Sequence, residues 1–597
     1  MHTYLDGLNV SQKQAVEHTD GPSIILAGAG SGKTRVIVHK VLHLISAHEI
    51  DPKHILMITF TNKASREMKD RISHQSNGSV VLGYAGTFHS LSAMILRRDG
   101  EHIGIPHSYV IYDDSDQEHL LKDIVKKLGT KYSYRYFASK ISDAKNQLIT
   151  PDRFLEKFSY YKAAEVAEVY YLYQKALKES SAVDFDDLIM KVVMLFREHP
   201  QVLSKYQDRF KYILVDEFQD TNVAQYALTK MLANKYRNIT VVGDFSQSIY
   251  SWRGADIRNL NTFTLDFPEA VTIHLEENYR STQEILTFAY EVISINESHP
   301  VLRLFTQNPE GEKIRYYQAE NEEEEATYVA NKITEVTYDM PHAEIAVLYR
   351  TNAQSRILEE AFLHYSIPYT LIGGTRFYER KEIKDVLSYL RLLLHPEDKS
   401  ALDRILKLGK RRFVPFKSFY QRIKDSVNEI PTVELMEQIF KETEYLGFYD
   451  PDIEEDYARL ENIKELKSVG MRFPQLVDFL EQVALVESEY FSGEKGKKQE
   501  DGVRLMTLHQ AKGLEFEAVF ITGLEEGILP HSRSIDDNQQ LEEERRLFYV
   551  GITRAKKLLH ITYAKRRLIF GRRNEAMKSR FIRTDADLES QEEDIWW

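Results

Sequence analysis

The feature that most constrains this chain is the segment SIILAGAGSGKT, residues 23–34. A short apolar run from Ser23 to Leu26 predicts a buried strand, and the pattern from Arg35 to Ile45 predicts a helix. Glycines at positions 28, 30 and 32 favour a loop between them in which backbone N–H groups converge. Because a strand, a glycine loop and a helix in this order cradle phosphate oxygens, the segment predicts a phosphate-binding loop.

The residues of this loop have separate expected parts. Lys33 is expected to reach the terminal phosphates of a nucleotide, and the Thr34 hydroxyl is placed for Mg²⁺. The loop backbone is expected to bind the other phosphate oxygens through Ala27, Gly28, Ala29, Gly30, Ser31 and Gly32. Ala27 stands where the usual pattern has glycine, which is a slight change because alanine is small. A chance glycine-rich turn, the competing interpretation, does not explain the flanking strand and helix.

Composition limits the class of protein. At 597 residues the chain is too long for one core, and roughly three to five domains are expected. The absence of cysteine excludes disulfides and thiolate metal sites, and it fits a reducing compartment, so a cytoplasmic protein is expected. No apolar run has membrane-spanning length, and the first residues do not resemble a signal peptide. The net charge of −13 argues against a protein coated in positive charge but leaves room for a local basic groove.

Acidic residues follow a second predicted strand, Tyr212 to Val215. Asp216 is expected to hold Mg²⁺, and Glu217 to position or deprotonate the attacking water. Beyond the next predicted strand, residues 239–243, Gln247 is placed to sense the γ-phosphate. Downstream of a phosphate loop, an apolar run followed by Asp-Glu predicts the second half of an ATPase site.

Other predicted strands, at residues 55–60 and 80–85, end in hydroxyl and aromatic side chains. The carboxyl ends of strands are where open α/β sheets bind ligands. Phe60 therefore has two equal interpretations, a base-stacking platform or a core phenylalanine. Tyr250, Trp252 and Arg253 lie in a polar loop and are placed to stack on or contact nucleic acid, although Trp252 also fits a core position.

A predominantly helical region, about residues 92–205, interrupts the alternation of strands and helices. Within it, residues 126–137 interleave basic and aromatic side chains. The segment fits a nucleic-acid-binding surface or, alternatively, a solvated face over buried rings.

The ordered motifs of both halves resemble the superfamily 1 DNA helicases of the UvrD/PcrA/Rep type. The resemblance covers nearly the whole chain, from about residue 8 to about residue 582. It rests on residues 8–12, 27–34, 59–64, 86–90, 216–220, 243–254 and 278–280 in the first half, and on 346–356, 503–516 and 544–555 in the second.

The resemblance implies an α/β fold with two RecA-like P-loop NTPase domains, each carrying a mainly helical inserted subdomain. Residues 1–91 and 206–276 are expected to form the first motor domain, and 277–378 with 503–582 the second. Their insertions are expected at 92–205 and, in a shortened form, at 379–502, followed by an acidic tail at 583–597.

The resemblance also implies roles for side chains that the residues alone left open. Gln12 would read adenine between Tyr279 and Arg35, and Glu515 would bind the ribose. Arg280 and Arg554 would be arginine fingers that reach the γ-phosphate across a cleft between the motor domains. The residues expected to contact DNA are Phe60, Thr87, His89, Tyr250, Trp252, Arg253, Asn352, His531 and Phe570.

The implied activity is an ATP-dependent helicase or translocase that moves 3′ to 5′ on single-stranded DNA in repair, replication or recombination. ATP and Mg²⁺ are the expected cofactors. Single strands and single-strand/duplex junctions are the expected substrates, with a protein loading partner, no membrane, and a monomer or weak dimer. Two alternatives stay open: a translocase that displaces proteins from DNA with weak unwinding, and the motor subunit of a nuclease complex.

The chain departs from the family pattern at several places. Phe245-Ser246 replaces residues that are commonly acidic, and the second insertion is short. Residues 407–415 replace a duplex-binding glycine turn, so that turn is not evident, and they leave a basic quartet, Lys407, Lys410, Arg411 and Arg412, for phosphates. The chain closes on Trp596-Trp597, which fits a disordered end or a docking peg. We therefore expect single strands to dominate DNA binding.

Overall fold

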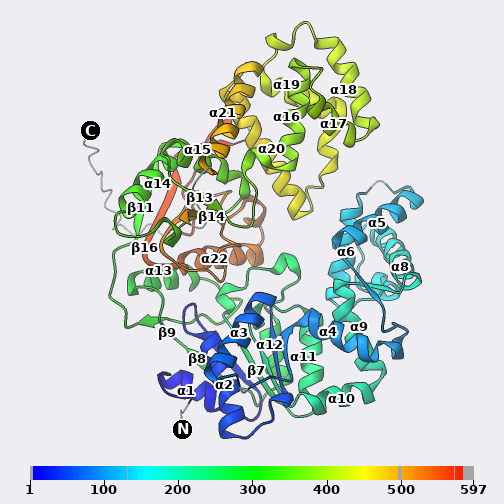
Figure 1. Cartoon of the computed structure of the whole chain (residues 1–597), viewed down its shortest axis with the longest axis vertical. Helices are drawn as coiled ribbons and strands as arrows, with labels where there is room; N and C mark the ends of the chain where they lie inside the picture. Colours follow the sequence, from blue (N-terminus) through cyan, green and yellow to red (C-terminus); the bar gives the residue numbers. More distant parts are fainter. Residues whose placement is uncertain (1–3, 79, 131, 495–500, 570–571, 583–597) are drawn as a thin grey trace. The chain divides into compact units, whose positions relative to one another are not determined.

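The computed structural model describes residues 4–78, 80–130, 132–494, 501–569 and 572–582 (Figure 1). The chain forms two compact units. Unit 1 comprises residues 1–280 and 297–308, and unit 2 comprises residues 281–296 and 309–597. No helix in the described ranges is both long and apolar enough to cross a membrane.

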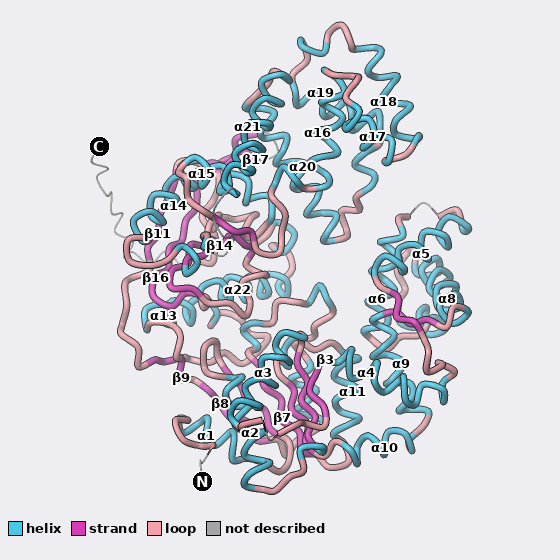
Figure 2. Tube along the Cα trace, viewed as in Figure 1, coloured by secondary structure: helices cyan, strands magenta, loops and turns pink. Residues whose placement is uncertain are grey.

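The described residues of unit 1 form a six-stranded sheet in the order β3-β2-β6-β7-β1-β8, and each pair of neighbours is parallel. Figure 2 draws the strands in magenta and labels β3, β7 and β8. Its strands are β1 (Ser23–Ala27), β2 (Ile55–Thr59), β3 (Tyr84–Thr87), β6 (Tyr212–Val215), β7 (Asn238–Gly243) and β8 (Val271–Leu275). The strand predicted at residues 80–85 begins later, at Tyr84. The backbone N–H of Gly83 is bonded to Pro52 outside the sheet, which delays the start of the strand.

Alternate residues of β1 enter two different cores. Ile24 and Leu26 face one core, whereas Ile25 and Ala27 face the other. The first core also contains residues of α4 (Phe88–Asp99), α9 (Phe185–Glu198), α10 (Pro200–Arg209), α11 (Val223–Ala233) and α12 (Asn259–Asp266). The second contains residues of α1 (Val10–Glu17), α2 (Lys33–Ala47) and α3 (Asn62–Gln75). Helices therefore cover both faces of the sheet.

A separate helical insertion follows α4 and has its own core, from Leu121 to Ala182. It contains α5 (Asp114–Leu128), α6 (Tyr134–Asn146), α7 (Phe154–Lys157), α8 (Ala163–Glu179) and the paired strands β4 (Val110–Tyr112) and β5 (Ala182–Asp184). The helices α4, α9 and α10 pack on the six-stranded sheet of unit 1. The separate core therefore spans fewer residues than the insertion predicted at 92–205. Helical periodicity identifies an apolar face but not the partner of that face.

The described residues of unit 2 contain a second parallel sheet, in the order β11-β16-β15-β12-β14-β13. Its strands are β11 (Arg315–Ala319), β12 (Ile345–Tyr349), β13 (Tyr369–Leu371), β14 (Val503–Thr507), β15 (Phe516–Ile521) and β16 (Ala555–Ala564). The other elements of this part are α13 (Gln283–Ile293), α14 (Glu322–Val336), α15 (Ser355–His364), α22 (Asn538–Ile552) and the hairpin β17 (Arg566–Ile569) and β18 (Arg572–Glu575). The α/β class with two parallel sheets is as predicted.

Six helices inserted into unit 2 share a core that runs from Phe377 to Val486. They are α16 (Lys381–Leu394), α17 (Lys399–Lys407), α18 (Lys410–Ile423), α19 (Thr432–Thr443), α20 (Glu454–Arg472) and α21 (Leu476–Glu494). A tight turn at Leu408-Gly409 joins α17 to α18, with Gly409 at φ +100°. One glycine with positive φ is enough to reverse the chain here, and the lack of the family's duplex-binding glycine turn stays a prediction.

The chain passes between the two units more often than predicted. The sequence predicted one passage, at residue 277, whereas the structure divides the chain at 280, 296 and 308. The returning segment pairs β10 (Phe305–Thr306) with β9 (Glu277–Asn278) inside unit 1. These strands are two residues long, which is too short for a periodic sequence signal.

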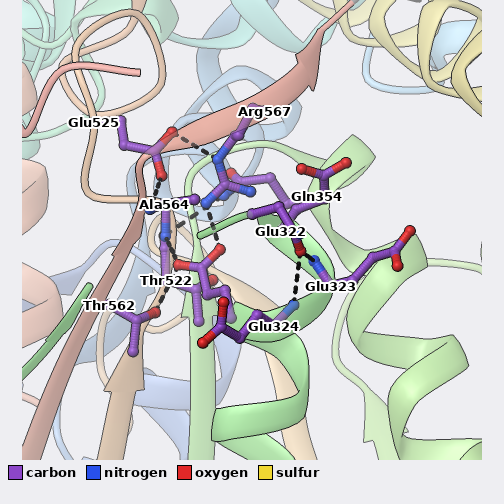
Figure 3. Close-up of polar contacts among 12 residues, drawn as sticks. Glu322, Glu323, Glu324, Gln354, Thr522, Glu525, Thr562, Ala564 and Arg567 are labelled. Atoms are coloured by element: carbon purple, nitrogen blue, oxygen red, sulfur yellow. Dashed lines mark hydrogen bonds and ion pairs between the residues drawn. The ribbon is translucent and has the colours of Figure 1, made fainter. Parts of the chain in front are cut away.

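A buried ion network lies beside the second sheet (Figure 3). The Arg567 guanidinium pairs with Glu325 of α14 and, at 2.6 Å, with Glu525. Glu325 also accepts hydrogen bonds from the Gly523 N–H and the Thr562 hydroxyl, at 2.9 and 2.7 Å. The network therefore joins α14, β16 and the β17–β18 hairpin.

We expect Arg567→Met to lower the free energy of unfolding by about 3–5 kcal/mol, because two buried carboxylates lose their cation. The neighbouring Arg566 is exposed, so Arg566→Met is the matched control, with an expected effect within about 0.5 kcal/mol. Urea denaturation of both variants measures the difference. Equal midpoints would mean that the network adds nothing to stability.

Candidate functional site

The glycine loop between β1 and α2 is closely packed by its neighbours. Gly30 and Gly32 have φ values of +66° and +85°. A Cβ atom on Gly30 would lie 2.7 Å from the Asn278 side chain, and one on Gly32 would lie 2.9 Å from the Gln12 amide. Glycine is therefore required here both for the backbone conformation and for the close approach of these side chains.

Lys33 begins α2, and its ammonium lies across the loop. The Nζ atom donates to the carbonyl oxygens of Ala27 and Gly28, at 3.3 and 3.4 Å. The ammonium, the loop N–H groups and the N-terminus of α2 thus concentrate positive potential at one place, which suits a phosphate chain.

The carboxylate predicted for the metal ion is buried at the end of β6. Asp216 is 6% exposed, and its Oδ1 atom is buried without a hydrogen-bond partner among the described residues. Burial and then the Glu217 charge raise the pKa of Asp216 to about 7, against the opposing effect of Lys33. An unpartnered buried oxygen fits a divalent cation.

Within the described residues no group of three His, Cys, Asp or Glu side chains could hold a metal ion. A magnesium ion bound by Asp216 would therefore need oxygens from Thr34, water and the phosphates. That is a common arrangement for this ion.

Glu217 follows in a left-handed backbone conformation, with φ +51°. Gln219 links it to the next strand: its amide donates to Glu217 Oε2 at 2.5 Å, and its Oε1 accepts from the Asp244 N–H at 3.1 Å. A non-glycine residue at positive φ is strained and is held only where its surroundings fix it. The position of the Glu217 carboxylate is therefore fixed by the segments that follow both β6 and β7.

Gln247 lies in a short helical turn after β7. Its amide donates to Asp244 Oδ2 at 2.6 Å, and Asp244 also caps the turn through the Ser246 N–H. Phe245 is a core residue, and the Ser246 hydroxyl lies 3.1 Å from His299 Nε2. The unusual Phe-Ser pair is thus accommodated by local packing.

The predicted adenine-reading residues surround the start of α1. Gln12 is fully buried, and its amide donates to the Ser31 carbonyl at 3.0 Å while its Oε1 accepts from the Asn9 N–H. The Tyr279 ring is 47% exposed, and its hydroxyl accepts from Asn9 Nδ2 at 2.8 Å. Arg35 donates to the Gly7 carbonyl at 3.0 Å. The structure brings these three predicted residues to one side of the loop.

Sequence reasoning missed the part that Asn278 plays. Its amide donates to the Ala29 carbonyl at 2.6 Å, and its Oδ1 accepts from the Arg280 N–H at 2.8 Å. The Tyr279 N–H donates to the Gly30 carbonyl at 3.0 Å. The segment that carries Arg280 is therefore fastened directly to the glycine loop, and only its place after β8 signals this in the sequence.

In unit 2 the structure places Arg554 and Glu515 side by side. The Phe516 N–H donates to the Arg554 carbonyl at 2.9 Å, and the Arg554 guanidinium donates to the Leu514 carbonyl at 3.1 Å. Arg554 is 2% exposed and also donates to Val550, whereas Glu515 is exposed and lies 3.4 Å from Lys556. The expected finger is folded against its own unit in this structure.

Four predicted DNA-contacting residues form an aromatic ladder in unit 1, composed of Phe60, Tyr250, Trp252 and Arg253. The Phe60 and Tyr250 rings are parallel within 5°, with centroids 6.2 Å apart. Trp252 is 43% exposed and lies edge-on to Tyr250, and Arg253 covers its ring at 4.5 Å. Neither Phe60 nor Trp252 is a core residue, so the core interpretation of both was wrong.

A second aromatic pair lies at the start of two helices of unit 1. Thr87 is buried, and its hydroxyl caps α4 through Ser90. His89 is half-buried, which lowers its pKa, and its ring meets Phe185 edge-on at 6.0 Å. Phe185 is 49% exposed and was missed, because one phenylalanine at a helix start has no distinctive pattern.

Two of the DNA-contacting residues predicted in unit 2 lie in the described part of the chain, and each is at least half-buried. Asn352 is half-buried, and its carbonyl accepts from Arg380 at 2.9 Å. His531 is only 6% exposed: its Nε2 lies 3.3 Å from Glu461, and its Nδ1 accepts from the Arg533 N–H. The structure therefore does not present the His531 ring on a surface. Phe570 lies outside the described residues.

Two members of the basic quartet contact other side chains of the same helical insertion. Lys407 and Lys410 are exposed beside the Gly409 turn. Arg411 pairs with Glu444 at 2.7 Å, and the Arg412 guanidinium lies 3.4 Å from the centre of the Phe448 ring. That all four meet phosphates stays a prediction, and the sequence does not reveal the contacts of the two arginines.

Two family models match the chain. The model of the UvrD/REP helicase N-terminal domain matches residues 8–268. The model of the UvrD-like helicase C-terminal domain matches residues 273–449 and 410–566. Together these matches reach across both units.

Full-length relatives agree with the family models. The chain is 42% identical over 637 residues to the "ATP-dependent DNA helicase PcrA" of Staphylococcus epidermidis, covering 98% of this chain and 87% of that protein. It is also 42% identical over 639 residues to the protein of the same name from Staphylococcus aureus, with the same coverage. The glycine loop, the Asp216–Glu217 pair and the aromatic ladder are thus features of a chain that belongs to the UvrD/PcrA-type superfamily 1 DNA helicases.

Proposed function

We propose that this chain is an ATP-dependent DNA helicase that moves 3′ to 5′ along single-stranded DNA and couples ATP hydrolysis to duplex unwinding. The observation that carries the proposal is the position of the aromatic ladder. Phe60 follows β2 and Tyr250 follows β7, at the same edge of the sheet where the glycine loop follows β1. A nucleotide site and a base-stacking surface thus share one rigid framework.

The proposed chemistry assigns a part to each site residue. The loop and Lys33 bind the phosphates, and Asp216 with Thr34 holds Mg²⁺, which would neutralise charge on the transferring phosphoryl group. Glu217 orients the attacking water, and Gln247 senses the γ-phosphate. Gln12, Arg35, Tyr279 and Glu515 bind the nucleoside, and Arg280 and Arg554 stabilise the transition state.

We propose that ATP hydrolysis is coupled to DNA movement through the loop that carries both Gln247 and the stacking rings. Gln247 and Trp252 are separated by only five positions of one loop, and Tyr250 lies between them. A change at the γ-phosphate can therefore shift the rings that stack on bases. Stacking suits a motor because every base has an aromatic face, so the grip does not depend on sequence.

The finer parts of the proposal follow the family. They comprise the four-part division into two motor domains and two insertions, a cytoplasmic location, a monomer or weak dimer, a loading partner, and work in repair, replication or recombination. The DNA contacts at Thr87, His89, Asn352 and Phe570 belong to this group. For His531 we propose only an indirect part, through the loop that it supports.

A translocase that displaces proteins from DNA with weak unwinding is the second candidate. The contacts of two arginines favour it, since the Glu444 carboxylate competes with phosphate for Arg411 and the Phe448 ring covers the Arg412 guanidinium. Strand displacement and protein displacement measured on the same 3′-tailed duplex separate the two candidates. A 5′-tailed duplex tests the direction of movement.

Two substitutions separate nucleotide binding from hydrolysis. Lys33→Ala should abolish hydrolysis by weakening the grip on phosphate, whereas Glu217→Gln should still bind ATP and hydrolyse it about 10²–10⁴-fold more slowly. Nucleotide affinity and single-strand-stimulated turnover should be measured for both. Loss of ATP affinity in Glu217→Gln would make Glu217 a structural residue.

The aromatic ladder predicts a stacking-sized loss. Trp252→Ala should weaken single-strand binding by about 1–3 kcal/mol, while hydrolysis without DNA continues. Tyr338→Ala, which removes an 87% exposed ring of unit 2, is the control and should leave affinity unchanged. Fluorescence anisotropy with an oligonucleotide measures both. Unchanged affinity with early melting of Trp252→Ala would return Trp252 to a structural role.

A further inference from the structure

The N-terminal segment (residues 4–18) is fastened to α2 through its backbone. Side chains on α2 reach carbonyl oxygens of this segment at several points. These contacts are Arg35 to Gly7 at 3.0 Å, His39 Nδ1 to Tyr4 at 2.6 Å, and Lys40 Nζ to Ala15 at 3.0 Å and to His18 at 2.5 Å. The segment is therefore held by α2 along its length.

Lys40 is the most buried of these anchors, at 2% exposure. Its two acceptors lie at the end of α1, where Ala15 belongs to the last turn and His18 is the C-cap. The last carbonyls of a helix lack partners within the helix and carry partial negative charge. The ammonium of Lys40 thus caps α1 from the side.

This position is costly for a lysine. Burial lowers the pKa of Lys40 to about 7, which reflects the loss of water around the ammonium. A well-packed apolar side chain would fill the same space without that cost. The gain from the ammonium is the fixed position of α1 relative to α2.

The other end of α1 carries Gln12. Its amide is bonded to the Ser31 carbonyl and touches the position of Gly32, so it lies directly against the glycine loop. Lys33 and Lys40 are seven residues apart on α2, which is about 10 Å along the axis. One helix therefore carries both the phosphate contact and the anchor of the segment that presents Gln12.

We propose that Lys40 is a positioning residue that fixes Gln12 relative to the phosphate loop and thereby sets the preference of the nucleotide site for adenine. The inference rests on the proposed function. Lys40 does not touch the nucleotide. Without its ammonium the end of α1 loses two hydrogen bonds, and the Gln12 amide is no longer held at one distance from the phosphates. Lys33, Asp216 and Glu217 keep their geometry.

The test compares Lys40→Met, which keeps chain length but cannot donate, with Lys40→Arg, which keeps the charge and the donors. Turnover with saturating single-stranded DNA should be measured with ATP, GTP and CTP. Lys40→Met should raise KM for ATP about tenfold, leave kcat within twofold, and change KM for GTP and CTP little. Lys40→Arg should restore the preference for ATP.

A matched control separates positioning from stability. Lys145 is also buried, in the helical insertion, where it pairs with Asp184 and Asp187. Lys145→Met should lower the unfolding midpoint without changing the preference among nucleotides. If Lys40→Met does not fold, Lys40→Gln is the alternative, because its amide can still donate. Lys40→Gln should raise KM for ATP by less than the tenfold expected of Lys40→Met.

Two results would overturn the inference. One is a folded Lys40→Met protein with wild-type KM values and preference. The other is an equal loss of kcat for all three nucleotides with KM unchanged, which would indicate a general structural defect. Failure of the proposed function is distinct from both, because the unmodified protein would then not hydrolyse ATP.

Discussion

The parallel order of the strands in unit 1 is the constraint on which the candidate site depends. All six strands end at one edge of the sheet, so the segments that follow them must meet there. The glycine loop at residues 28–32 precedes Asp216 by more than 180 residues and Gln247 by more than 210. The central strands β1, β2, β6 and β7 each contribute side chains to both cores, so the sheet holds these ends rigidly.

At this edge of the sheet, side chains from other segments bond to backbone carbonyls of the glycine loop. Asn278 bonds the Ala29 carbonyl, Gln12 bonds the Ser31 carbonyl, and both side chains occupy space that a larger loop residue would need. The loop is therefore shaped by its neighbours as much as by its own glycines. This close packing also explains why Arg280 and Gln12, which come from opposite ends of the unit, approach the same few atoms.

Buried charge is used in different ways across the molecule. Lys145 and Arg567 are paired with carboxylates, which offsets the loss of water. Within the described part of the chain, one buried oxygen of Asp216 has no hydrogen-bond partner, which suits a cation-binding carboxylate. Among the described residues, the Lys40 ammonium donates only to the carbonyls of Ala15 and His18. The net charge of −13 therefore says little about local chemistry.

The sequence by itself determined the local units: the strand, glycine loop and helix, the acidic pair after β6, the order of the motifs, and the α/β class. These follow from patterns within a few residues, where burial and backbone preference act directly. Only the tertiary structure decided that His531 is buried, that Arg412 packs on Phe448, that residues 297–308 return to unit 1, and that Lys40 grips α1. Each of these depends on which distant group fills the space beside a side chain, and periodicity reports a buried face without naming what buries it.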